Sequence, residues 1–186
     1  MASKDRSVER SRDYFDALYR EHYGKIVRFA IRCTDPQTAR DVAAETFLQA
    51  WRRLSTIPPG KELPWLYTVA RNVINNERRG RTRRTRLDER LHALPPDRDP
   101  DLADGVVERL HARQLLDSLP AKDREALRLV EWEHLDLDAA ARVAGCSAAT
   151  FRGRLHPARR RLAAADEAFR RENVPVHKLI TDEALS

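Results

Sequence analysis

The chain has 186 residues, of which 34% are charged, and its formal net charge is +6. This charge suits a polyanionic partner, either nucleic acid or an anionic membrane surface. No apolar run approaches the roughly 20 residues that span a bilayer, and the N-terminal stretch MASKDRSVERSRDYFD lacks the apolar segment of a secretion signal. These features argue against a membrane-spanning or secreted chain, and we expect a cytoplasmic protein of one domain or two small ones.

Cysteine, histidine and glycine usage argues against most enzyme classes. Cys33 and Cys146 are too few for a disulfide framework, and the six histidines do not cluster at metal-ligand spacing. The six glycines form no phosphate-binding loop, and no nucleophile and base signature stands out. We therefore expect no cofactor, no metal and no catalytic activity.

The N-terminal part of the chain predicts three helices. Apolar residues recur at three- and four-residue spacing over residues 13–33. Asp35 and Pro36 are typical of a helix start, because Asp35 can cap free N–H groups and Pro36 lacks a donor where none is needed. The first inward stripe comprises Phe15, Leu18, Tyr19, His22, Ile26, Phe29, Ala30 and Cys33. Cys33 is interpreted as a packed core thiol, with a redox role as the alternative.

The second helix has two distinct faces, and a loop follows it. Its inward face comprises Ala39, Val42, Ala43, Thr46, Phe47, Ala50, Trp51 and Leu54. Its outward face comprises Arg40, Asp41, Glu45, Gln49 and Arg52. The stretch STIPPG at residues 55–60 cannot continue a helix because of its paired prolines. A third helix is expected over residues 64–79, with Leu66, Val69, Ala70, Val73 and Ile74 inward.

Basic clusters and a linker divide the chain. Residues 76–86 hold six arginines and one acid, whereas residues 152–161 hold five arginines and no acid. Between them, residues 86–104 are rich in proline and aspartate and have almost no apolar pattern. This composition predicts a flexible linker.

The C-terminal part predicts a helix-turn-helix. After helices over about residues 106–119 and 121–134, Asp136 can cap a short helix, Gly145 and Cys146 supply a tight turn, and Ser147 can cap a second helix. Cys146 is expected to be a small buried residue. Val143, Phe151, Leu155 and Leu162 are expected in the core by their spacing.

The second helix of such a motif enters the major groove of DNA. Arg152, Arg154 and His156 lie where long donors reach base edges, and the following Arg159, Arg160 and Arg161 suit the sugar-phosphate backbone. The alternative is a solvated basic end of an ordinary helical bundle.

Four segments together resemble a known family. They are DVAAETFLQAW at residues 41–51, PWLYTVARNVIN at residues 64–75, SLP at residues 118–120 and GCSAATFRGRLH at residues 145–156. In order and spacing they resemble the extracytoplasmic-function sigma factors of bacteria, the minimal type that contains only sigma domains two and four. The resemblance covers about residues 12–165 and implies an all-α fold of two small helical domains joined by a flexible linker.

The resemblance implies the boundaries of these domains. Residues 1–11 are expected to be a flexible N-terminus, residues 12–85 sigma domain two, a bundle of three or four helices, and residues 86–104 the linker. Residues 105–165 are expected to form sigma domain four, and residues 166–186 a C-terminal tail, with a regulatory contact as the alternative for the tail.

The resemblance also assigns roles in domain two. It implies that the outward face of the second helix docks on a coiled coil of the largest RNA polymerase subunit, and that loop 55–62 and the third helix read the melted minus-ten element. The polymerase contacts would be Asp41, Glu45, Gln49 and Arg52, for which a merely solvated face is the alternative. The minus-ten contacts would be Ser55, Thr56, Lys61, Trp65, Arg71, Asn72, Asn75, Arg78 and Arg79. Trp65 and Asn72 would lie beside the flipped base and Arg71, Arg78 and Arg79 on phosphates, with a core role as the alternative for Trp65.

Domain four is expected to bind the minus-thirty-five duplex and the polymerase flap. Its DNA contacts would be Ser147, Thr150, Arg152, Arg154, His156, Arg159 and Arg160. Gly153 and Pro157 depart from the family pattern, in which polar or basic residues are usual there. Pro157 removes a hydrogen bond to the carbonyl of Gly153 and is expected to bend the recognition helix. Ala139 replaces a frequent glutamate, so no reciprocal capping box is expected at Asp136.

Two other functions remain as alternatives. A stand-alone helix-turn-helix regulator would bind a palindromic operator without polymerase, and a basic protein of RNA or membrane surfaces would explain the arginines but not the pattern of residues 64–75. Restraint by an anti-sigma protein, common in the family, is a further hypothesis.

Overall fold

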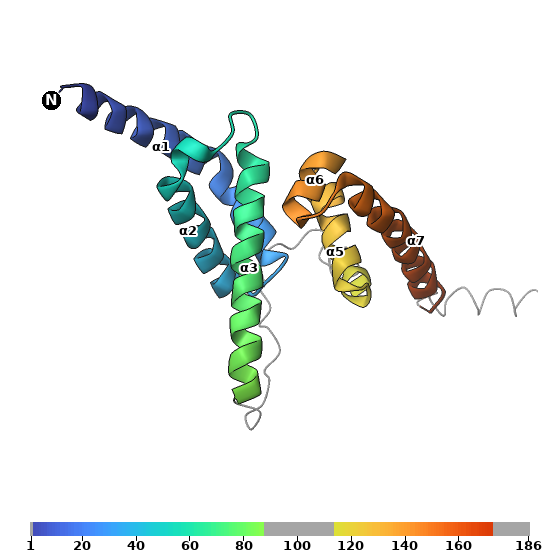
Figure 1. Cartoon of the computed structure of the whole chain (residues 1–186). Coiled ribbons are helices and arrows are strands. Elements are labelled where there is room, and N and C mark those ends of the chain that lie inside the picture. The colour runs from blue at the N-terminus through green and yellow to red at the C-terminus, as the bar shows by residue number, and fades with distance from the viewer. Residues whose placement is uncertain (1, 88–113, 173–186) are drawn as a thin grey trace, which may run out of the picture. The chain divides into compact units, whose positions relative to one another are not determined.

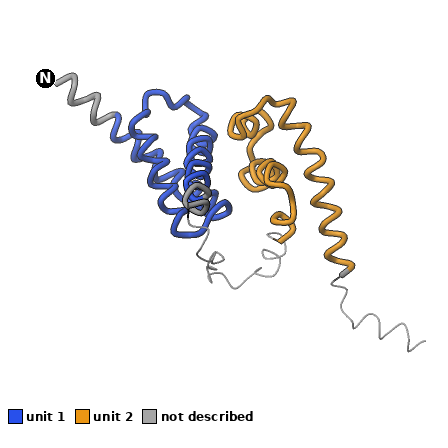
Figure 2. The backbone as a smooth tube through the Cα atoms, turned by 60° about the horizontal axis from the view of Figure 1, so that its bottom comes forward, with its two compact units in different colours: residues 1–100 blue, residues 101–186 orange. Residues whose placement is uncertain are grey.

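The computed structural model describes residues 2–87 and 114–172, with side chains over residues 11–81 and 114–171. Every regular element in these ranges is helical. The chain divides into two compact units, residues 1–100 and 101–186 (Figure 2). The predicted all-α fold with two helical domains is confirmed for the described residues, whereas linker residues 88–104 lie outside them.

Unit 1 is a bundle of three helices in which each helix contacts the other two (Figure 1). They are α1 (Ala2–Ile31), α2 (Pro36–Arg52) and α3 (Glu62–Leu87), with a short 3-10 turn, η1 (Leu54–Thr56), after α2. α3 is longer than the expected helix over residues 64–79: it begins two residues earlier and ends eight residues later, so its last two residues enter the predicted linker. η1 likewise takes up the first two residues of the predicted loop 55–60.

The core of unit 1 follows the predicted stripes with five exceptions, of which Phe15 and Leu54 are half-buried. Tyr19 is 40% exposed and Trp51 is 43% exposed, so the prediction of an inward position is wrong for both side chains. Cys33 is half-buried and not a packed core thiol. The predicted residues that are buried are Leu18, His22, Ile26, Phe29, Ala30, Ala39, Val42, Ala43, Thr46, Phe47, Ala50, Leu66, Val69, Ala70, Val73 and Ile74.

Asp35 begins α2 as the sequence predicts. Its Oδ1 accepts a hydrogen bond from the backbone N–H of Thr38 at 2.9 Å, and Pro36 occupies the first turn. This bond satisfies one of the free donors at the helix N-terminus. The turn between α1 and α2 therefore has a fixed geometry.

Unit 2 contains a helix-turn-helix on a helical support. Its elements are residues 114–118, α5 (Ala121–Leu127), the π-helical η2 (Arg128–Trp132), α6 (Leu137–Ala144) and α7 (Ala148–Glu172). α7 packs against both α5 and α6. α7 also extends seven residues into the segment expected as a tail, and residues 173–186 lie outside the described part of the chain.

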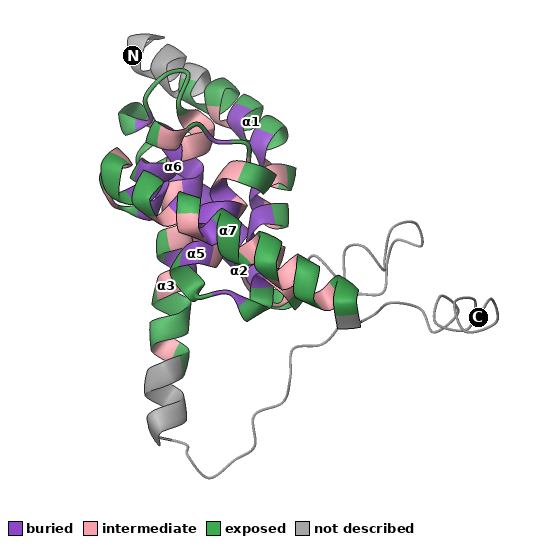
Figure 3. Ribbon diagram, turned by 90° about the vertical axis from the view of Figure 1, so that its right-hand side faces the viewer, coloured by how far each residue is buried: buried purple, intermediate pink, exposed green. Residues whose placement is uncertain are grey.

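The core of unit 2 ends partway along α7. Val143, Phe151 and Leu155 are buried as predicted, and Ala158 is fully buried. After Ala158 every described residue of α7 is exposed or half-buried, so the prediction is wrong for Leu162 (Figure 3). Cys146 is half-buried, because it lies in the turn rather than beneath it.

Candidate nucleic-acid interface

A polar stripe runs along the outside of α2. Asp41 and Arg52 are exposed, whereas Glu45 and Gln49 are half-buried. The amide Nε2 of Gln49 donates a hydrogen bond to Oε1 of Glu45 at 2.9 Å. Because residues four apart share a helix face, these four predicted polymerase-contact residues form one continuous surface.

An aromatic cluster between α1 and α2 lies near this stripe, and the sequence interpretation missed it. The Phe15 and Trp51 rings pack edge to face with centroids 5.1 Å apart, and Tyr19 packs on Phe47 at 4.9 Å and stacks on Tyr23 at 4.8 Å. The signal was present as four-residue spacing of aromatic residues on both helices. The apolar stripe therefore continues to the surface instead of ending in the core.

One carboxylate holds the loop before α3 in place by accepting hydrogen bonds. Oε1 of Glu62 accepts hydrogen bonds from the backbone N–H of Gly60 at 3.0 Å and from the hydroxyl of Tyr14 at 3.3 Å. Gly60 has a φ of 72°, which favours glycine. Hydrogen bonds from the Glu62 backbone, Gly60 and Tyr14 lower the pKa of Glu62. The predicted minus-ten residues Ser55, Thr56 and Lys61 are exposed on this fastened loop.

A pocket of about 350 Å³ lies beneath this loop against α1. Its wall includes His22, whose side chain is 8% exposed and whose Nδ1 has no hydrogen-bond partner in the described part of the chain. Burial lowers the pKa of His22, against the opposing effect of Glu21. A neutral imidazole is therefore favoured at this position.

One side of α3 presents the predicted base-contacting residues. Trp65, Asn72, Asn75 and Arg79 follow one another at spacings of seven, three and four, which places them along one helix face opposite the buried stripe. Trp65 and Asn75 are half-buried, whereas Asn72 and Arg79 are exposed. The Nε of Arg79 donates to the Asn75 carbonyl at 3.3 Å. The helix thus offers an aromatic ring, two amides and a guanidinium to one partner.

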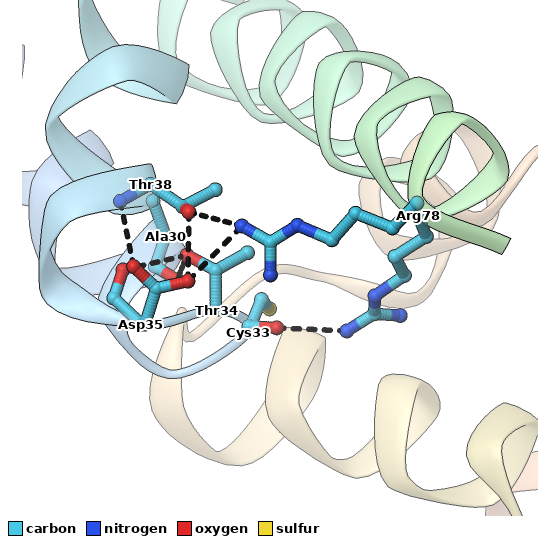
Figure 4. A network of polar contacts seen from close by, with 7 residues as sticks. Ala30, Cys33, Thr34, Asp35, Thr38 and Arg78 are labelled. Carbon is cyan, nitrogen blue, oxygen red and sulfur yellow. Dashed lines mark hydrogen bonds and ion pairs between the residues drawn. The ribbon is translucent and has the colours of Figure 1, made fainter. Parts of the chain in front are cut away.

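A second side of α3 binds the turn between α1 and α2 (Figure 4). Nη2 of Arg78 donates to the carbonyl of Cys33 at 2.8 Å, and Nη2 of Arg81 donates to Oδ2 of Asp35 at 3.2 Å and to the hydroxyl of Thr38. The hydrogen bonds from Thr38 lower the pKa of Asp35 to about 2. Arg78, expected on phosphates, therefore has an acceptor within unit 1, and Arg71 is half-buried with an interaction of its own.

The helix-turn-helix forms through the predicted caps. Oδ1 of Asp136 accepts from the backbone N–H of Ala139 at 2.7 Å, and Oγ of Ser147 accepts from that of Thr150 at 3.1 Å. Gly145 adopts a left-handed φ of 67° between the two helices. The hydroxyls of Ser147 and Thr150 also lie 2.8 Å apart. Both predicted DNA-contacting hydroxyls thus take part in the cap of α7.

The basic residues over positions 152–161 of α7 fall into two groups. Arg152, His156 and Arg160 are exposed and Arg154 is half-buried. Arg159 binds Glu131 on η2 and Arg161 binds Asp123 on α5. The sequence interpretation assigned Arg159 and Arg161 to the DNA backbone and missed both acidic partners. α7 is continuous through Pro157, so both groups belong to one helix, and a bend at Pro157 stays a prediction.

Within residues 2–87 and 114–172, none of the helices combines the length and the apolar character that a membrane span requires. The same residues contain no group of three or more histidine, cysteine, aspartate or glutamate side chains placed to hold a metal ion.

Both halves of the chain match known protein families. Residues 18–84 match Sigma-70 region 2, and residues 109–162 match Sigma-70, region 4. The first match contains α2 and most of α3, and the second contains the helix-turn-helix. The polar stripe, the α3 face and the capped turn all lie inside these matches.

Two solved structures share the fold. The sigma factor RpoE, in complex with the anti-sigma factor NepR from Bartonella quintana, has a TM-score of 0.72 at 24% identity, over 82% of this chain and 96% of that chain. CnrH, in complex with the cytosolic domain of CnrY, has a TM-score of 0.62 at 23% identity, over 84% of this chain and 90% of that chain.

Named relatives are similar over most of their length. The ECF RNA polymerase sigma factor SigL of Mycobacterium tuberculosis (strain ATCC 25618 / H37Rv) is 33% identical over 78% of this chain and 85% of that protein. SigM of Bacillus subtilis (strain 168), also an ECF RNA polymerase sigma factor, is 30% identical over 80% of this chain and 93% of that protein. The resemblance deduced from four sequence segments is confirmed, and the chain belongs to the ECF RNA polymerase sigma factors.

Proposed function

We propose that this chain binds core RNA polymerase in the cytoplasm and directs it to promoters, without catalysing a bond change itself. Residues 12–85 act as the polymerase-docking and minus-ten module, and residues 105–165 act as the minus-thirty-five module. Residues 86–104 tether the two. The observation that carries the proposal is the pair of family matches, each of which contains an outward surface suited to its task.

Docking on polymerase uses the polar stripe of α2. Asp41, Glu45, Gln49 and Arg52 offer charge and hydrogen bonds along one helix face, and we propose that they contact a coiled coil of the largest polymerase subunit. Glu45→Arg is expected to abolish association with core polymerase in a pull-down, because it reverses a charge at the centre of the stripe. The exposed Asp16→Arg on α1 is the control, since it changes the net charge equally. Equal binding by both variants would contradict this docking surface.

Promoter opening uses the α3 face. A base extruded from the duplex loses a few kcal/mol of stacking and pairing, and Trp65 and Asn72 can return part of this through ring contact and hydrogen bonds on its exposed edge. Recruitment through polymerase comes first, because a small protein with few phosphate contacts binds free DNA weakly at physiological salt.

Run-off transcription tests the whole proposal. Core polymerase with this chain is expected to start at a subset of a genomic promoter library that core polymerase alone does not use. Asn72→Ala is expected to impair opening, measured by permanganate reactivity of unpaired thymines, while polymerase binding is kept. Gln37→Ala, an exposed amide on α2, is the control. Tight binding to a palindromic duplex without any association with polymerase would instead establish a stand-alone regulator.

We also propose that an anti-sigma protein restrains the chain. The support is by analogy, because the RpoE structure is a complex with the anti-sigma factor NepR. Deletion of such a partner in the native cells should raise transcription from promoters that depend on this chain. Full output under all conditions, with no deletion that raises it, would contradict the restraint.

A further inference from the structure

Arginines on α7 occur as two pairs with seven-residue spacing. Arg152 and Arg159 lie on one flank of the helix, and Arg154 and Arg161 lie on the other, because seven residues complete nearly two turns. In each pair the arginine nearer the turn has no intramolecular hydrogen bond or ion pair within the described residues. The arginine farther along binds an acid of the supporting helices.

Arg159 and Glu131 form the more separable of the two contacts. Oε1 of Glu131 accepts from Nε of Arg159 at 3.0 Å and from Nη2 at 2.8 Å. The side chains are 54% and 42% exposed, respectively. An exposed pair of this kind adds little to folding stability. Asp123, by contrast, has a side chain only 9% exposed, so its bond to Arg161 also supports the fold.

The position of Arg159 suits a phosphate contact. It shares a flank with Arg152, about two turns farther from the capped end of the helix that enters the groove. A guanidinium there would bind the backbone of any sequence, whereas Arg152 and Arg154 on the first turns are placed to reach bases. Every phosphate contact adds affinity equally to right and wrong sites.

We propose that Glu131 is a specificity-determining residue that withholds Arg159 from DNA. The inference rests on the proposed role of unit 2 as a reader of duplex DNA. Glu131 acts in two ways: it occupies the donors of Arg159, and its own negative charge repels a nearby phosphate. By lowering affinity for all sequences it raises the share of binding that depends on Arg152 and Arg154, which is selection against wrong partners.

The salt dependence of binding measures this directly. The full chain is titrated against a short labelled duplex of mixed sequence at several sodium chloride concentrations. Glu131→Gln is expected to bind about twofold to fivefold more tightly, the scale of an exposed ion pair. The slope of log affinity against log salt should become steeper by about 0.9, the value for one added phosphate contact.

Two further variants separate release of Arg159 from a general change of charge. Asp138→Asn removes the same charge at an exposed position on α6 and should leave the slope nearly unchanged. Arg159→Gln combined with Glu131→Gln should abolish the steeper slope. Arg159→Gln alone should lower the slope by less than Arg160→Gln, because Arg160 has no intramolecular partner within the described residues.

The binding measurements on these variants either support or overturn the role of Glu131. The inference is overturned if Glu131→Gln behaves as Asp138→Asn does, or if its effect persists when Arg159 is absent. It is supported if, in addition, the affinity ratio between a duplex recovered from the run-off library and the mixed duplex falls in Glu131→Gln. If the wild-type chain neither associates with polymerase nor yields such a duplex, the proposed function fails instead. Thermal melting by circular dichroism checks that each variant is folded.

Discussion

In unit 1, Arg78 and Arg81 of α3 bind the turn between α1 and α2, whereas in unit 2, Arg159 and Arg161 of α7 bind acids on η2 and α5. Asp35 accepts bonds from Thr38 as well as from Arg81, and it also caps α2. Glu131 accepts hydrogen bonds from Arg159 and has no other hydrogen bond or ion pair within the described residues.

The two basic segments therefore differ in how much the fold loses when the acidic partner of an arginine is removed. Removing Asp35 must disturb a helix start together with an arginine, so the pairing in unit 1 cannot be changed without cost to the fold. Removing Glu131 changes almost only the availability of one cation. The DNA affinity of unit 2 is therefore the easier one to adjust by substitution.

The largest expected effect tests whether the units are independent. Phe151 is completely buried in unit 2, and Phe151→Ala should lower the unfolding free energy of that unit by about 3–5 kcal/mol through lost burial and a residual cavity. Unit 1 should keep its stability. Urea titrations followed by the amide NMR signals of each unit measure the two unfolding free energies. A single unfolding transition, shared by both units and shifted as a whole by the substitution, would contradict their independence.

The next effect sharpens the division of arginines on α7. Arg154→Ala should weaken recognition of a promoter duplex by roughly 1–3 kcal/mol, the cost of losing one good base contact. Arg170→Ala removes the same charge from the exposed end of the same helix and should cost less, without a change in sequence preference. Competition binding with single-base variants of the duplex distinguishes the two losses. Equal losses would mean that Arg154 contributes charge alone.

The sequence predicted the elements whose signals are local. The cap at Asp35, the turn at Gly145 and the cap at Ser147 were each deduced from the residues and are confirmed, because capping and left-handed glycine depend on neighbours in the chain. The two-domain fold itself was implied by the resemblance of four segments to a known family.

Contacts between distant residues could not be deduced in this way. Arg159 reaches Glu131 across 28 positions and Arg78 reaches Cys33 across 45, and no periodicity within one helix indicates such pairs. The exposure of Trp51 escaped prediction because spacing shows which face a residue shares, but not how far the neighbouring helix covers it. The partners of individual arginines therefore required the structure.

A smaller effect concerns the unit 1 network. Asp35→Ala should lower the stability of unit 1 by about 0.5–2 kcal/mol, as is usual for a lost N-cap, whereas Asp35→Asn keeps a capping oxygen and should cost less. The folded pKa of Asp35 is about 2, below its ordinary 3.8. Its contribution is therefore present above pH 3.8 and is lost as the pH falls toward 2. Urea midpoints across this range should show that loss in the wild type and not in Asp35→Asn.

The smallest effect concerns His22, in the same unit but at higher pH. Burial lowers the folded pKa of this imidazole below its ordinary 6.5, so as the pH falls below 6.5 the unfolded chain takes up the proton first and stability declines. His22→Gln should remove this decline from a plot of unfolding free energy against pH. Glu21→Gln should enlarge it, because the Glu21 carboxylate favours the charged imidazole. A decline that is unchanged in both variants would assign it to another group of unit 1.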